Sequence, residues 1–161
     1  MREKELYPAI SKWLYQFLSD RYGRSQICVF DSSRTKLSRL LFKYHLTRHF
    51  PHYNTFDIQV DITGIVEKKS TTLLAFVECK LNDITLRDVG QIWGYSKVAS
   101  PEYSFLISPT GPSESLLYLL KTFGRYDLLE YQKNKRTIIG NWDIKRKDLD
   151  YASILPPGEL R

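Results

Sequence analysis

The chain has 161 residues, of which 42% are hydrophobic and 14% aromatic, and its net charge is +6. This length and composition predict one packed domain over residues 1–161 and exclude an intrinsically disordered chain, while the charge favours a polyanionic partner. No apolar run reaches the about 18 residues of a membrane-spanning helix, and the charged residues 1–5 do not resemble a secretion signal. Cys28 and Cys79 lie in apolar runs, which is typical of free thiols, so we expect a cytoplasmic protein.

Hydrophobic periodicity along the chain predicts the element order α-β-α-β-β-α-β-α-β-β. Helices are expected around residues 6–17, over 35–50, after the cap residue Thr85 and after the cap residue Ser113. The third helix is expected to begin with a capping box of Thr85 and Asp88 and to have an apolar face of Leu86, Val89 and Trp93. Strands are expected at residues 26–30, 60–66, 73–81, 103–107, 128–131 and 137–144. This order predicts the α/β class, with a mixed β-sheet flanked by helices.

Charged residues interrupt two neighbouring apolar runs. Asp61 lies in the run 60–66, and Glu78 and Lys80 end the run 73–81. Burying such groups costs free energy unless they are paired or bind something. Because side chains alternate along a strand, Glu78 and Lys80 point to one face, roughly 6.5 Å apart. A hairpin that turns at residues 67–70 brings Asp61 to the same place, and the three groups indicate a site for a hard cation and a phosphate.

The residue between the acid and the lysine contributes through its backbone. The Cys79 side chain points away from Glu78 and Lys80, but its carbonyl oxygen is a candidate ligand for Mg²⁺. Without a metal the carboxylates of Asp61 and Glu78 repel each other, so removing either is expected to hold or raise the stability of the protein.

Asp61 together with Glu78-Cys79-Lys80 resembles the PD-(D/E)XK motif of the restriction-endonuclease-like nucleases. Val60 precedes Asp61 where the motif has proline, a residue that is often missing in the family. The likeness covers residues 1–110. It implies a restriction-endonuclease-like fold and a Mg²⁺-dependent deoxyribonuclease, with Mn²⁺ able to substitute for Mg²⁺.

The next helix carries a second resemblance. Gln91 and Tyr95 are four residues apart and therefore project from one helical face. They are similar to the Gln-x-x-x-Tyr motif of the exonuclease and Holliday-junction-resolvase-like branch of the same superfamily. The resemblance implies that Gln91 supports the attacking water or a phosphate, and that Tyr95 leans toward the DNA backbone. The alternative is an ordinary polar helix face.

The resemblance also implies the metal ligands. Asp61, Glu78 and the Cys79 carbonyl would hold one or two metal ions, and Lys80 would orient a water or neutralise the phosphate. Glu5 is the expected extra ligand from the first helix, and Glu3 fits that pattern nearly as well. Asp57 is the rival of Asp61, because the two share one face of the same extended run. A purely structural ion-pair cluster is the alternative for the whole group.

A basic stretch without any acidic residue separates Asp31 from Asp57. Lys36, Arg39 and Lys43 in this stretch, together with Arg87, are the candidate contacts to DNA phosphates. A solvated basic face is the alternative, and residues 133–147 form a second basic surface. The three histidines at 45, 49 and 52 also lie here, but Pro51 ends the helix between the last two and disfavours a zinc site.

Two other functions remain open from the sequence. A non-catalytic nucleic-acid-binding domain of the same fold would keep the architecture without the chemistry, although the intact set of Asp61, Glu78 and Lys80 argues against it. A structure-specific nuclease of the Holliday-junction type is the second, since no target-recognition segment is evident. Because cutting both strands of DNA usually needs two such sites, a homodimer is expected in that case.

Overall fold

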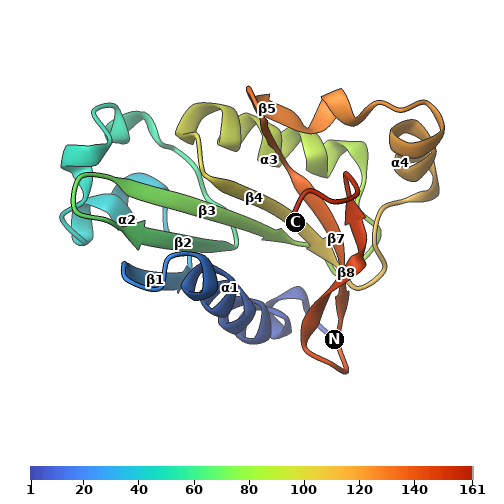
Figure 1. Ribbon diagram of the computed structural model, residues 1–161, viewed down its shortest axis with the longest axis horizontal. Helices are drawn as coiled ribbons and strands as arrows, with labels where there is room; N and C mark the ends of the chain where they lie inside the picture. Colours follow the sequence, from blue (N-terminus) through green and yellow to red (C-terminus); the bar gives the residue numbers. More distant parts are fainter. Residues whose placement is uncertain (161) are drawn as a thin grey trace.

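The computed structural model describes residues 1–160 of the chain (Figure 1). Its helices are α1 (Tyr7–Arg21), α2 (Leu37–Lys43), α3 (Leu86–Ala99) and α4 (Glu114–Leu117). Its strands are β1 (Gln26–Asp31), β2 (Ile62–Glu67), β3 (Thr72–Cys79), β4 (Tyr103–Ser108), β5 (Glu130–Gln132), β6 (Lys135–Arg136), β7 (Ile138–Asp143) and β8 (Asp148–Leu155).

Six strands form one mixed sheet in the order β1-β2-β3-β4-β7-β8, and β5 and β6 form a separate small sheet. β1, β2 and β3 are antiparallel to one another, β4 and β7 run parallel to β3, and β8 returns antiparallel to β7. The predicted α/β class with a mixed, helix-flanked sheet is therefore confirmed, while the restriction-endonuclease-like fold stays a prediction. Since β3, β4 and β7 are parallel, their carboxyl ends lie at one edge of the sheet.

Helices cover both faces of the sheet (Figure 1). Because side chains alternate along β3, successive residues of this strand pack into the cores on opposite faces. Ala75, Val77 and Cys79 pack in the core beneath α1. Leu74 and Phe76 point the other way, into a core shared with α2 and the end of α3. Glu78 belongs to this second face by the same alternation, so the chain places an acid where the apolar face ends.

The second helix is shorter than predicted. α2 ends at Lys43 instead of continuing to residue 50, because His45 adopts a positive φ of 57° that breaks the helical pattern. Two short 3-10 turns, Thr47–His49 and Tyr53–Thr55, follow. The three histidines therefore do not share a helical face.

The edge strand β8 was not predicted from the sequence. The turn that joins it to β7 contains neither glycine nor proline, which are the usual turn signals. The carboxylate of Asp143 forms the turn instead, since its Oδ1 accepts the backbone N–H groups of Lys145 and Arg146 at 2.9 and 3.0 Å.

α3 turns a different face to the sheet than its apolar residues indicate. Leu86 and Trp93 are 53% and 37% exposed, although they were expected to form the apolar face with Val89. Ser96 is fully buried instead, with its Oγ 2.8 Å from Oγ of Ser104 in β4. The face toward the core consists of Val89, Ile92, Ser96 and Ala99. Across residues 1–160 no helix has the length and apolar character needed to cross a membrane.

Candidate active site

Glu78 and Lys80 lie at the carboxyl end of β3, between β2 and β4. Glu78 is only 6% exposed. Lys80 follows the strand, and its backbone N–H donates to the carbonyl of Ile107 at 2.8 Å, which holds the chain against β4. Nζ of Lys80 lies 3.3 Å from Oε1 of Glu78. The two side chains therefore meet on one face of the sheet, as the alternation of a strand requires.

Asp61 stands directly before β2 and opposite Glu78. The antiparallel register pairs Ile62 with Val77, so the next position across the two strands pairs Asp61 with Glu78. Oδ2 of Asp61 accepts the backbone N–H of Cys79 at 2.8 Å. This bond satisfies a buried amide just beyond the ladder between β2 and β3. The carboxylate is thus held rigidly at the end of the strand pair.

A tyrosine without any distinguishing pattern in the sequence completes the support of Asp61. The hydroxyl of Tyr7, in the first turn of α1, donates to Oδ1 of Asp61 at 2.6 Å. The same hydroxyl lies 3.5 Å from Oε1 of Glu3. Both oxygens of Asp61 therefore accept a hydrogen bond, one from α1 and one from β3.

Of the two N-terminal glutamates, Glu3 approaches the site and Glu5 does not. Glu3 lies in a 3-10 turn, Glu3–Glu5, directly before α1, and its carboxylate accepts from the Tyr7 hydroxyl at 3.5 Å. Glu5 lies two residues from Tyr7, faces away, and pairs with Arg2 at 3.5 Å with half of its side chain exposed. Burial, followed by the charge of Asp61, raises the pKa of Glu3, whereas the charge of Lys80 lowers it. Of the two candidates, the structure therefore brings Glu3 and not Glu5 beside Asp61 and Lys80.

Asp57, the rival of Asp61, also lies outside the group. Its carboxylate pairs with Nζ of Lys36 at 3.0 Å, and 78% of its side chain is exposed. The alternation expected along this run is present, because Phe56 and Ile58 are buried and Asp57 is exposed. The run nevertheless has no strand pairing before Ile62, so only Asp61 reaches the end of β3.

The hydrogen bonds of Asp61 change the stability expected of its alanine variant. We expect Asp61→Ala to lower the free energy of unfolding, because it leaves the Cys79 N–H buried without an acceptor, at about 1–3 kcal/mol, and leaves the Tyr7 hydroxyl only its long contact with Glu3. Relief of the repulsion with Glu78 offsets part of this loss. Urea denaturation in EDTA measures the result, with Asp57→Ala as the exposed control. An unchanged or raised midpoint for Asp61→Ala would show that repulsion outweighs both bonds.

The electrostatics of the site centre on Glu78. Burial, followed by the charge of Asp61, raises the pKa of Glu78 to about 7, although Lys80 acts in the opposite direction. Burial alone would lower the pKa of Lys80, but the charges of Glu78, Asp88 and Glu3 raise it overall. Lys80 is therefore a firmly charged ammonium beside an acid that ionises near neutral pH.

The oxygen atoms at this edge of the sheet suit a hard cation. Oε2 of Glu78 is buried and has no hydrogen-bond partner, so one acceptor is left over after the contacts within residues 1–160 are made. Within the same residues no three His, Cys, Asp or Glu side chains come close enough to form a metal cage. Mg²⁺ needs no such cage, since it is usually held by one or two carboxylates together with water and substrate phosphates. Asp61 and Glu78 fit that pattern, with the Cys79 carbonyl as the predicted third oxygen.

The first turn of α3 reaches the site through Asp88. Oδ2 of Asp88 accepts from the backbone N–H and the hydroxyl of Thr85 at 2.8 and 3.0 Å, which forms the predicted capping box. Oδ1 of Asp88 lies 3.7 Å from Nζ of Lys80. One residue thus starts the helix and fixes the catalytic candidate Lys80. The sequence showed the capping role but not the ion pair.

The two motif residues of α3 have different surroundings. Gln91 lies three residues after Asp88 on the same helical side and is exposed, with no hydrogen bond to any of residues 1–160. Its carboxamide is free to reach a bound group. Tyr95 is half-buried and packs against the core under α2, which includes Phe76. Its ring therefore contributes to packing as well as to the surface.

The predicted DNA contacts differ in how close they lie to the carboxyl end of β3. Arg87 is exposed in the first turn of α3, next to Asp88. Arg39 and Lys43 are exposed on α2, which packs over Leu74 in the first half of β3, away from its carboxyl end. Lys36 precedes α2, where its pairing with Asp57 offsets part of its charge.

Two further cations outside α2 share one hollow on the surface. Lys4 and Arg34 line this hollow of about 370 Å³ together with Ser33 and the acidic Asp31. This hollow adjoins the site, because the N–H of the neighbouring Ser32 donates to the carbonyl of Asp61 at 2.9 Å. Lys4 had no distinguishing pattern in the sequence, and its position becomes visible only when α1 and β1 are packed.

Comparison with known proteins adds no relative: no family model, no curated protein and no solved structure matches the chain. The likeness to the PD-(D/E)XK nucleases therefore rests on the residues and their spacing. Membership of that superfamily stays a proposal.

Proposed function

We propose that the protein is a Mg²⁺-dependent deoxyribonuclease of the PD-(D/E)XK type that hydrolyses phosphodiester bonds of DNA in the cytoplasm. The observation that carries this proposal is the buried pair Asp61 and Glu78, facing each other at the end of β3 with Lys80 beside them. A purely structural cluster would satisfy all of its polar atoms, whereas Oε2 of Glu78 has no partner.

The side chains have separate roles in this proposal. Asp61, Glu78 and the Cys79 carbonyl would hold Mg²⁺, with Glu3 nearby as a further carboxylate. When bound there, the ion supplies Lewis-acid stabilisation of the phosphate and acidifies a water. The ammonium of Lys80 is a compact charge that can neutralise the charge developing on the phosphate.

Other residues serve this centre by position. Tyr7 holds Asp61 through its short hydrogen bond, and Asp88 holds Lys80. The free carboxamide of Gln91 can orient a water or a phosphate oxygen. Arg87 stands beside Asp88 and is placed to contact the DNA backbone next to the reacting phosphate.

Incubation with DNA tests the proposal. The purified protein should cut at least one of supercoiled, linear, single-stranded and branched DNA in Mg²⁺ or Mn²⁺, and EDTA should abolish cutting. The matched control is Glu78→Gln, which keeps the shape of the side chain but removes its charge. Preference for branched DNA would identify a junction-type nuclease. If none of the four substrates is cut with either metal, the proposed nuclease activity is overturned. The alternative, a non-catalytic DNA-binding domain, then remains.

The basic surface should determine how binding depends on salt. Replacing Lys36, Arg39 and Lys43 together by alanine is expected to weaken binding equally for all sequences, because phosphate contacts carry no sequence information. The slope of log K against log salt should fall by up to about 0.9 per lost contact. Gel shifts in Ca²⁺ measure both quantities.

Two double variants, measured in the same way, show whether the effect belongs to this basic surface. Lys68→Ala with Lys69→Ala, at the turn between β2 and β3, is the control for removing exposed charge. Lys4→Ala with Arg34→Ala tests the hollow beside Asp61 and should lower the slope further. If the α2 variant leaves affinity and slope unchanged, the DNA surface lies elsewhere, with the basic residues 133–147 as the next candidate.

A further inference from the structure

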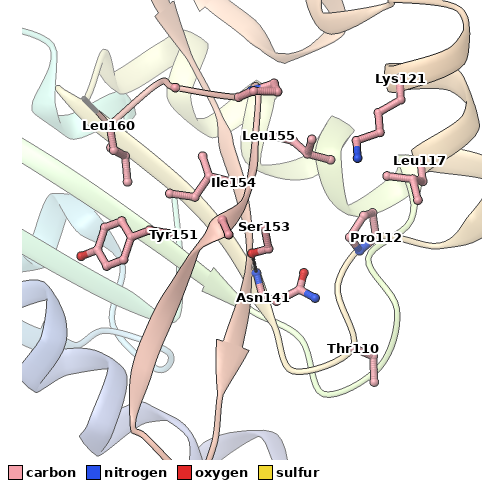
Figure 2. Close-up of a pocket in the computed structure, with 13 residues that line it drawn as sticks. Thr110, Pro112, Leu117, Lys121, Asn141, Tyr151, Ser153, Ile154, Leu155 and Leu160 are labelled. Atoms are coloured by element: carbon pink, nitrogen blue, oxygen red, sulfur yellow. Dashed lines mark hydrogen bonds between the residues drawn. The ribbon is translucent and has the colours of Figure 1, made fainter.

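One cavity of the structure lies outside the candidate active site. It has a volume of about 510 Å³ and is bounded by β8, the end of β7, the loop after β4 and the helical segment that follows α4 (Figure 2). Small-ligand sites commonly have volumes of about 300–1,000 Å³. The cavity also sits beside the carboxyl ends of the parallel strands β4 and β7, where open α/β sheets usually bind ligands.

Two polar groups enter this cavity without a partner. Figure 2 shows the ammonium of Lys121 and the carboxamide of Asn141 facing the same space from different walls. Within residues 1–160, Lys121 makes no ion pair, and the Asn141 carboxamide makes no hydrogen bond. A Cβ at Gly111, whose φ is +79°, would collide with Oδ1 of Asn141, so this glycine leaves the room that the carboxamide occupies.

The helical segment that carries Lys121 and the strand β8 that pairs beside Asn141 are both irregular at the cavity. Lys121 lies on a π-helical turn, Tyr118–Thr122, which directly continues α4. Such turns occur frequently at functional sites. A π-turn displaces the following side chains relative to a regular helix, so it sets the direction of Lys121.

The second irregularity is a register shift in the pairing between β7 and β8. Asn141 pairs with Asp150, but Ile139 pairs with Leu155, so residues 151–154 of β8 stand opposite the single residue Gly140. Ser153 fills the gap, because its Oγ accepts the backbone N–H of Asn141 at 2.8 Å. Irregularities in a strand pair, such as β-bulges, re-aim side chains next to binding sites.

The lining defines the chemistry of the ligand. Lys121 supplies one compact positive charge, which suits a phosphate. Asn141 supplies a donor and an acceptor side by side, which matches the paired donor and acceptor on the edge of a nucleobase. Leu117 and Leu160 are half-buried, line the cavity and offer apolar surface to a ring.

We propose that this cavity binds a nucleoside monophosphate unit, with the phosphate on Lys121 and the base edge on Asn141. The unit is either a free mononucleotide or an unpaired nucleotide of a nucleic-acid strand. This second site does not depend on the proposed nuclease activity, because it uses none of the residues at the end of β3.

Calorimetric titration of the full chain in EDTA tests the site with adenosine 5′-monophosphate, adenosine and inorganic phosphate. The monophosphate should bind more tightly than either part alone. Lys121→Gln should lower the affinity for the monophosphate by about tenfold or more and leave the affinity for adenosine unchanged. Asn141→Ala should lower the affinity for both. Lys133→Gln, an exposed lysine on the turn between β5 and β6, should change nothing.

Competition separates the two sources of the ligand. If a single-stranded oligodeoxyadenylate displaces the monophosphate, the ligand of the cavity is an unpaired nucleotide of a nucleic-acid strand. If it does not, the ligand is the free mononucleotide. The proposal is overturned if no probe binds up to about 10 mM, or if Lys121→Gln and Asn141→Ala bind like the parent protein. Loss of binding in Glu78→Gln would also overturn it, since the ligand would then occupy the active-site candidate.

Discussion

Replacing Lys80 by alanine is expected to abolish DNA cleavage while leaving DNA binding nearly unchanged. Lys80 is the ammonium held between Glu78 and Asp88, at 3.3 and 3.7 Å, and burial restricts it to this position. Loss of one charge aimed at the reacting phosphate costs about 10²–10³ in rate at comparable sites. Binding depends instead on many exposed cations, so one lysine contributes little to it.

Cleavage in Mg²⁺ and gel shifts in Ca²⁺ measure the two quantities on the same DNA. Lys12→Ala, an exposed lysine on α1, is the matched control and should retain both. The free energy of unfolding must also be compared, because Lys80 offsets the charges of two carboxylates. A Lys80→Ala protein that is folded and still cuts at the parent rate would exclude Lys80 from catalysis and leave it as a structural counter-ion.

The centre of the site could be predicted because it depends on local geometry. Alternation along β3 puts Glu78 and Lys80 on one face, and one hairpin brings Asp61 opposite Glu78. Neither relation requires knowledge of the rest of the fold. The capping box of α3 is equally local, since Thr85 and Asp88 are three residues apart.

The supporting residues could not be predicted because they meet through packing of distant segments. Tyr7 and Asp61 are 54 residues apart, and their contact depends on how α1 lies on the sheet. The choice between Glu3 and Glu5 depends on the same packing. The orientation of α3 depends on a hydrogen bond between two buried serines, Ser96 and Ser104, which apolar periodicity does not detect.

Glu78→Gln is expected to stabilise the metal-free protein at alkaline pH and to have little effect in acid. An exposed glutamate has a pKa of about 4.3 in the unfolded chain, whereas burial and Asp61 raise the pKa of Glu78 to about 7 in the fold. The unfolded state therefore ionises first, and stability falls as pH rises from about 4 through about 7. Above that window the penalty, in which the attraction to Lys80 is already included, reaches roughly 3 kcal/mol, and glutamine removes it.

Urea denaturation in EDTA across this pH range measures the difference between the variant and the parent. Glu5→Gln is the control, because Glu5 is an exposed glutamate that lies outside the site. The variant should gain about 1–3 kcal/mol over the parent at pH near 8, and the gain should vanish toward about pH 4. Addition of Mg²⁺ should narrow the gap by stabilising only the parent, since binding to the folded state raises stability. A constant difference at all pH values would contradict this prediction, because it would mean that folding does not raise the pKa of Glu78.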